Sequence, residues 1–176
     1  AKLRPSIQDG RRVVDADLEV EDSLPIHGAL EISNTGTDDT NDWRIRSSLQ
    51  HVNLTKHDDV LTVEWFTSPD VSDVNAYSAA YFLPLDDRWS MNIYAGLSDS
   101  DIEDVLPQLD IRGRGHFAGA QFTRVLEETP RYRTQLSLGW LYQYWENEQE
   151  IAGFTWEDRR LRLSMPSATL GYSSRV

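Results

Sequence analysis

The stretch that decides the fold runs from residue 20 to residue 34 and reads Val-Glu-Asp-Ser-Leu-Pro-Ile-His-Gly-Ala-Leu-Glu-Ile-Ser-Asn. Its first half is a polar hinge that contains Pro25 and Gly28, two residue types that are typical of turns. Its second half alternates, with Leu30 and Ile32 on one side of an extended chain and polar residues on the other. The segment therefore predicts a hinge that leads into a β-strand with one apolar and one polar face.

Alternating strands of the same kind continue to the end of the chain, with no segment of helical period between them. Ahead of them, residues 1–22 look like the end of another unit, in which Leu18 and Val20 belong to one short strand. From residue 29 onward we expect eight strands, at 29–36, 42–53, 60–67, 74–83, 89–98, 116–126, 133–145 and 158–173.

The connections between the expected strands also alternate in length. The short ones are 54–59, 84–88 and 127–132, and the longer, acidic ones are 35–41, 67–73, 99–115 and 146–157. Outer-membrane barrels show this asymmetry, with tight turns at the periplasmic rim and longer loops outside.

The strand faces differ most clearly in the fifth and seventh expected strands. Their apolar faces carry Trp89, Met91, Ile93, Ala95 and Leu97, and Leu136, Leu138, Trp140, Tyr142 and Tyr144. Many aromatic residues collect near strand ends, as they do at membrane interfaces, and five of the six tryptophans are among them: Trp43, Trp65, Trp89, Trp145 and Trp156. The same pattern is expected of core aromatics in a soluble β-domain, so the pattern alone leaves both solvents open.

The composition excludes several classes of protein. The 176 residues suffice for one domain with a core, and 17 Lys and Arg against 29 Asp and Glu give a formal net charge of −12. Binding to nucleic acid needs clustered cations, so no nucleic-acid partner is expected. The absence of cysteine excludes a disulfide scaffold and a thiolate metal site. No apolar run approaches the ~20 residues of a membrane helix.

Candidate chemical sites are weak. His51 and His57 flank a turn but lack the pattern of a metal site. The run from Asp99 to Asp104 offers clustered oxygens for calcium, but it lacks the glycine of an EF-hand loop, and a solvated external loop explains it better. No nucleophile elbow, phosphate loop or dinucleotide fingerprint is present. We therefore expect no catalytic residue, no cofactor and no metal site.

The polar strand faces hold the remaining candidates. In a barrel embedded in lipid, charged strand residues must face the lumen, because Arg on the lipid side at the bilayer midplane costs about 2–4 kcal/mol. In a soluble sheet the same residues are ordinary exposed side chains. The expected lumen-facing residues are Arg44, Arg46, Glu64, Arg124, Arg160 and Arg162.

The segment from Val20 to Glu31 resembles the junction of two-partner-secretion translocators, the haemolysin secretion/activation family. In that family the junction joins the last periplasmic POTRA strand to the first barrel strand. Weaker matches follow in the family's order at 53–54, 67–69, 81–84, 98–101 and 170–173. The junction residues that carry the resemblance are Asp22, Leu24, Pro25, His27 and Gly28.

The resemblance implies an all-β fold, an antiparallel transmembrane β-barrel. Residues 1–25 would be the end of a POTRA domain with the junction, and residues 26–176 the N-terminal part of a barrel, about eight of sixteen strands. The implied location is the bacterial outer membrane. The implied partners are its lipid bilayer and a large secreted exoprotein, such as a haemolysin or adhesin, which crosses the pore without ATP. The family's Val-Arg-Gly-aromatic loop is not found, since Ile111-Arg112-Gly113 comes too early and Arg114 follows it.

A second hypothesis belongs to another class. An eight-stranded barrel or sandwich, soluble or displayed at the surface, would bind a small ligand or glycan. The two hypotheses differ in the surroundings of the apolar faces. Lipid contact requires Trp89, Ile93, Leu136 and Trp140 to lie on an open surface, whereas a soluble module requires them to pack together in a closed interior.

Overall fold

The computed structural model describes residues 2–8, 11–17, 24–36, 41–71, 73–106, 109–151 and 154–174. All regular structure in these residues is β-strand, arranged in two antiparallel sheets. The first sheet is a hairpin of β1 (Lys2–Gln8) and β2 (Arg11–Asp17). No helix in the described part of the chain is long and apolar enough to cross a membrane.

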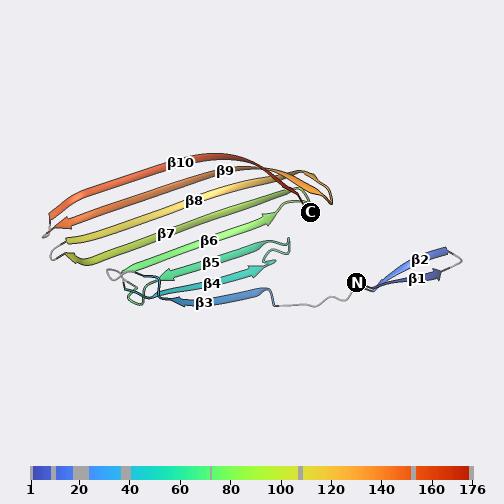
Figure 1. Cartoon of the computed structure of the whole chain (residues 1–176), viewed down its shortest axis with the longest axis horizontal. Coiled ribbons are helices and arrows are strands. Elements are labelled where there is room, and N and C mark those ends of the chain that lie inside the picture. The colour runs from blue at the N-terminus through green and yellow to red at the C-terminus, as the bar shows by residue number, and fades with distance from the viewer. Residues whose placement is uncertain are drawn as a thin grey trace.

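The second sheet contains eight strands, each hydrogen-bonded to the next in chain order (Figure 1). They are β3 (Ile26–Ser33), β4 (Arg44–Val52), β5 (Val60–Thr67), β6 (Val74–Pro84), β7 (Trp89–Leu106), β8 (Leu109–Glu128), β9 (Tyr132–Ile151) and β10 (Phe154–Ser174). This meander confirms the eight predicted strands, and β5 has the predicted bounds. The hairpin of β1 and β2 was not predicted, and the short strand expected at Leu18 and Val20 falls outside the described residues.

Strands β7 to β10 are much longer than predicted. The loop expected at 99–115 is wrong, because β7 continues to Leu106 and β8 begins at Leu109. The loop expected at 146–157 is wrong for the same reason, since β9 runs to Ile151 and β10 starts at Phe154. Charges on neighbouring strands explain the difference.

Cross-strand ion pairs link β7 and β8 at the start of these extensions. Arg112 Nε lies 3.1 Å from Asp101 Oδ2, and Arg114 Nε lies 3.5 Å from Asp99 Oδ2. Each pair consists of residues directly opposite in the register of β7 and β8. Opposite charges at such positions stabilise strand pairing, so an acidic segment forms a strand where its neighbour is basic.

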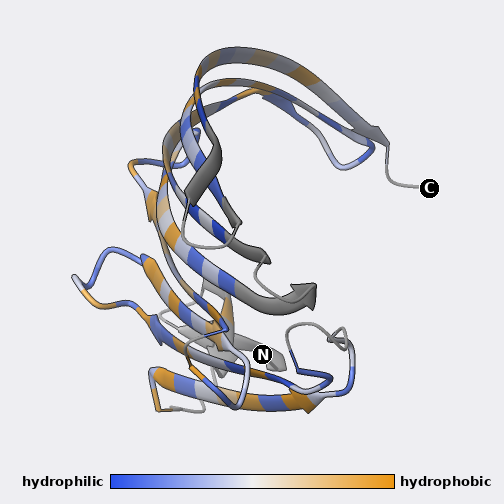
Figure 2. Cartoon of the chain, turned by 90° about the vertical axis from the view of Figure 1, so that its left-hand side faces the viewer, coloured by the Kyte–Doolittle hydropathy of each residue, from blue (hydrophilic) through white to orange (hydrophobic). Residues whose placement is uncertain are grey.

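The eight-stranded sheet is curved into an open trough (Figure 2). Its two edges are β3 and β10, and within the described residues these edge strands do not pair with each other. The connections 53–59, 85–88 and 129–131 lie at one rim, which we call the short-turn rim. These connections confirm the short turns that the sequence predicted.

Candidate functional site

The register of the strands divides the trough into two faces. Residues directly opposite each other on neighbouring strands point to the same side of a sheet. Ile93 is opposite Ala120, which is opposite Trp140. We call this side the apolar face, and it also carries Leu49, Val63, Tyr77, Trp89, Leu97, Phe122, Leu138 and Leu170.

The apolar face is open to its surroundings. Trp89, Ile93 and Trp140 are 39%, 44% and 47% exposed. Among the residues whose burial is described, Val125 is the one large hydrophobic residue that is buried. The closed interior that a soluble binding module needs is therefore missing from this part of the chain, whereas an exposed apolar band suits lipid.

The opposite side of the sheet is the polar face. It carries small and polar residues, among them Ser48, Thr62, Ser78, Asn92, Gln121, Thr123, Ser137 and Gln143. Hydrogen bonds join neighbouring strands here, since the hydroxyls of Thr123 and Ser137 are 2.9 Å apart. Ser137 is only 7% exposed, although it has a polar side chain.

Three of the six charged residues predicted for the lumen lie on the polar face. Arg46 is opposite Phe66, and its guanidinium carbon lies 5.6 Å from the centre of that ring. Glu64 is one register step away, opposite Ser48 and Ser78. Arg44 starts β4 and is 8% exposed, and its Nη1 donates hydrogen bonds to the carbonyls of Asn41 and Trp43 at 2.6 and 2.9 Å. Arg44 therefore has a structural role.

The prediction was wrong for Arg124, Arg160 and Arg162, which lie on the apolar face. Arg124 is opposite Trp89, with its guanidinium carbon 5.1 Å from the centre of a ring of that side chain. Arg162 is opposite Tyr144, and Arg160 is opposite Glu146. In β10 the apolar residues Leu161, Leu163 and Met165 have odd numbers, while Ala168, Leu170 and Tyr172 have even ones. Alternation read from one end of this strand therefore assigns the wrong face.

The junction residues meet the sheet at the short-turn rim. The carbonyl of Pro25 accepts a hydrogen bond of 2.7 Å from the amide of Val52, which attaches the hinge to the end of β4. His27 lies on the polar face opposite Gln50, and Gly28 lies on the apolar face opposite Leu49. Leu24 is 82% exposed, and Asp22 falls outside the described residues.

The turn between β4 and β5 contains a buried carboxylate that the sequence did not single out. Asp59 has no exposed surface, and it accepts hydrogen bonds from the amide and hydroxyl of Thr55 and from the phenol of Tyr81, at 2.9 to 3.2 Å. Burial raises the pKa of Asp59, but the bonds from Thr55 and Tyr81 outweigh burial and lower it to about 2. Positive φ angles at Asn53, Lys56 and Asp58 show a sharply bent backbone held by this carboxylate.

Two aromatic rings of the polar face cover glycines on the neighbouring strand. Tyr94 is opposite Gly119, and Phe117 is opposite Gly96. A Cβ atom at Gly119 would lie 2.5 Å from the Tyr94 ring, and one at Gly96 would lie 2.6 Å from the Phe117 ring. Both rings therefore lie flat on the wall of the trough. The glycine that each ring covers is set by the register of β7 and β8, which the sequence alone does not predict.

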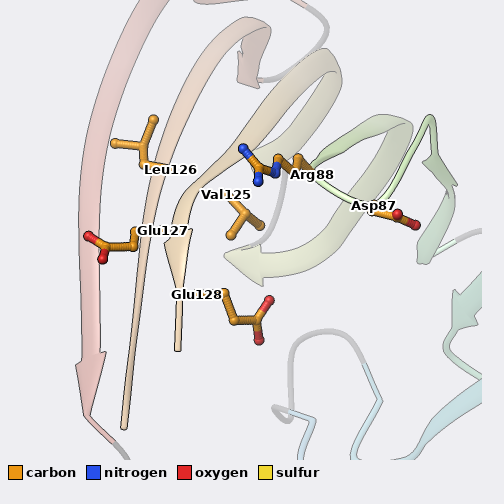
Figure 3. Close-up of a pocket in the computed structure, with 6 residues that line it drawn as sticks. All are labelled: Asp87, Arg88, Val125, Leu126, Glu127 and Glu128. Carbon is orange, nitrogen blue, oxygen red and sulfur yellow. The ribbon is translucent and has the colours of Figure 1, made fainter. Parts of the chain in front are cut away.

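A hollow of about 240 Å³ lies at the short-turn rim, where β8 has a bulge between Val125 and Glu127 (Figure 3). It is smaller than the ~300 Å³ at which ligand pockets begin. Figure 3 shows Arg88 beside Val125, whose amide donates a 2.8 Å hydrogen bond to the Arg88 carbonyl.

Comparisons with known proteins agree with this geometry. The structure is similar to CdiB from Escherichia coli, with a TM-score of 0.79 and 20% sequence identity, over 99% of this chain and 33% of that one. The chain thus spans one third of the length of CdiB, and the likeness shows a shared fold. No curated protein sequence matches the chain.

A family model, haemolysin secretion/activation protein ShlB/FhaC/HecB, matches residues 14–175. Members of this family are outer-membrane β-barrel transporters of Gram-negative bacteria. The match covers the whole eight-stranded sheet, from Ile26 to Ser174, and it confirms the resemblance carried by the junction segment. The chain therefore belongs to the ShlB/FhaC/HecB family of two-partner-secretion transporters in the outer membrane.

Proposed function

We propose that the polar face lines part of a pore through which a large secreted exoprotein, a haemolysin or an adhesin, crosses the outer membrane. The observation that carries this proposal is the separation of the two faces. The apolar face is exposed, so it suits lipid, while the opposite face of the sheet is polar. Family membership supports the same function.

The polar face offers a hydrated path. Arg46 and Glu64 carry opposite charges on neighbouring positions of β4 and β5, with hydroxyl residues such as Ser78 beside them. An unfolded polypeptide passing over such a surface exchanges hydrogen bonds with water and finds little apolar area on which to stick. Movement through it is passive, and folding of the exoprotein outside supplies the direction.

The two open edges support a larger barrel. Edge strands have unpaired backbone groups, which lipid cannot satisfy, so a membrane sheet must close. The partners of β3 and β10 would be the remaining strands of a sixteen-stranded barrel. On the periplasmic side, we assign residues 1–25 to the end of a POTRA domain, held at the pore mouth by the hinge from Asp22 to Gly28.

Pore conductance tests this proposal. In the complete translocator, Arg46→Glu reverses a charge on the polar face, and we expect it to change the ion selectivity of single channels in planar bilayers. Arg162→Gln on the apolar face is the matched control, since both arginines lie over an aromatic ring. Secretion of the exoprotein encoded beside the translocator gene is measured in parallel. Unchanged selectivity in Arg46→Glu, or an equal change in the control, contradicts the proposal.

A further inference from the structure

The apolar face ends in a stacked cluster at the rim opposite the short turns. His116, Tyr144 and Arg162 are direct neighbours across β8, β9 and β10. The rings of His116 and Tyr144 are 4.9 Å apart, and the guanidinium carbon of Arg162 lies 5.5 Å from the centre of the Tyr144 ring. We call these three residues the outer cluster.

The outer cluster stands at one boundary of the lipid. At the short-turn rim the stacked rings of Tyr132 and Tyr172, 5.9 Å apart, mark the other boundary. The twelve residue steps from Tyr132 to Tyr144 span about 40 Å along β9, or about 30 Å across a membrane at a ~40° tilt. Outer-membrane barrels have an apolar band about 25 Å tall between two aromatic girdles. Short turns mark the periplasmic rim, so the outer cluster meets the outer leaflet.

Arg162 is the available cation of this cluster. Glu146, its nearest acidic neighbour along the sheet, accepts hydrogen bonds from Arg160 at 2.8 Å and from the phenol of Tyr144 at 3.1 Å, one on each carboxylate oxygen. Arg162 forms no ion pair within the described residues, and its side chain is exposed. A guanidinium stacked on a ring keeps its N–H donors free at its edge, in the planar arrangement that binds phosphate.

An apolar groove lies beside the cluster on the same face. It has a volume of about 320 Å³, and His116 belongs to its wall. The other apolar wall residues are Val63, Tyr77, Ala79, Ala95 and Leu97. A groove of this chemistry next to an exposed cation matches a molecule with hydrocarbon chains and an anionic head.

We propose that the outer cluster binds a phosphate of lipid A, the membrane anchor of lipopolysaccharide, with an acyl chain in the adjacent groove. Lipopolysaccharide forms the outer leaflet of Gram-negative outer membranes, and lipid A carries phosphates above its acyl chains. Arg162 donates charge-assisted hydrogen bonds to the phosphate, Tyr144 orients the guanidinium, and His116 closes the side toward the groove. This site requires that the apolar face lies in the outer membrane. It does not require that the polar face lines an export path.

Native mass spectrometry of the complete translocator in detergent with EDTA tests the site, because EDTA removes divalent ions that bridge phosphates. We expect Arg162→Gln to weaken lipid A binding roughly tenfold, the loss of a charged hydrogen bond. Arg46→Gln, which removes an equally stacked arginine from the polar face, should bind like the wild type. Wild-type protein should also bind dephosphorylated lipid A roughly tenfold more weakly than lipid A, a comparison that needs no variant.

Three results overturn the proposal. Equal binding of phosphorylated and dephosphorylated lipid A by the wild type removes the phosphate contact. An equal loss in Arg46→Gln shows a general charge effect. If Arg162→Gln weakens binding of phosphatidylglycerol as much as that of lipid A, the cluster is a site for any phospholipid headgroup. Arg124→Gln at the periplasmic boundary should leave lipid A binding unchanged.

Discussion

Single residues determine the shape of the short-turn rim, and Asp59 is the clearest case. Its carboxylate satisfies the amide and hydroxyl of Thr55 and also receives the phenol of Tyr81 from β6. One side chain thereby fixes the turn and joins it to the neighbouring hairpin. These hydrogen bonds stabilise the ionised form of the Asp59 carboxylate, so protonation of the carboxylate weakens them.

Asp59 should make the stability of the barrel depend on pH. Its pKa is about 2 in the folded protein against an ordinary value of 3.8, so its contribution is complete above pH 3.8 and is lost as the pH falls toward 2. In Asp59→Asn this loss disappears, and the unfolding temperature above pH 4 should be lower than in the wild type. Circular dichroism of the complete protein in detergent measures both effects.

The matched control is Asp58→Asn, one residue away on the exposed side of the same turn. It should keep the pH dependence of the wild type. Parallel loss of stability in the wild type and Asp59→Asn between pH 4 and pH 2 would contradict a role for the Asp59 charge.

At the scale of the element, cross-strand charges maintain the extensions of β7 to β10. Asp99, Arg114, Glu146 and Arg160 are direct neighbours in one row across the four strands, with alternating charges. Single exposed pairs contribute little, but a row of alternating charges favours one register over all others.

Arg114→Glu should loosen the extension, because it sets three carboxylates side by side in that row. Proteolysis of intact cells should then cleave the β7–β8 extension several times faster than in the wild type. Arg114→Gln, which removes the charge without reversing it, should show a smaller effect. Cleavage of Arg114→Glu at the wild-type rate would show that the backbone ladder alone holds the extension.

The sequence predicts elements well where one face is apolar throughout. β5 and the start of β7 follow from Leu61, Val63 and Trp65, and from Trp89, Met91 and Ile93. Prediction fails where a strand, or the face of a residue, depends on the side chains of the partner strand. The acidic end of β7 needs Arg112 and Arg114 opposite it, and the face of Arg162 is set by Tyr144. Such pairings are absent from any single stretch of sequence.

At the scale of the whole molecule, the direction of curvature decides which side meets lipid. The exposed rings and aliphatic side chains lie on one face of the curved sheet, and the polar side chains lie on the other. Neighbouring residues of one strand therefore experience different solvents, and this difference can be measured with a pair of variants in β7.

Ile93→Arg should obstruct insertion, whereas Asn92→Arg should be tolerated. Ile93 lies in the middle of the apolar face, where arginine costs about 2–4 kcal/mol, and Asn92 lies on the polar face. Folding of the complete protein into liposomes, followed by the different gel mobilities of heated and unheated samples, measures the effect. Equal folding of the two variants would contradict the assignment of lipid to the apolar face.

The strands lengthen from eight residues in β3 to twenty-one in β10, and the surplus projects from the outer rim. The wall of the trough is therefore low on one flank and tall on the other. On the polar face of the tall flank, Trp145 and Leu161 are opposite each other, 42% and 50% exposed. If the polar face lines an export path as proposed, these side chains form an apolar surface at its outer end, to which an emerging polypeptide would bind.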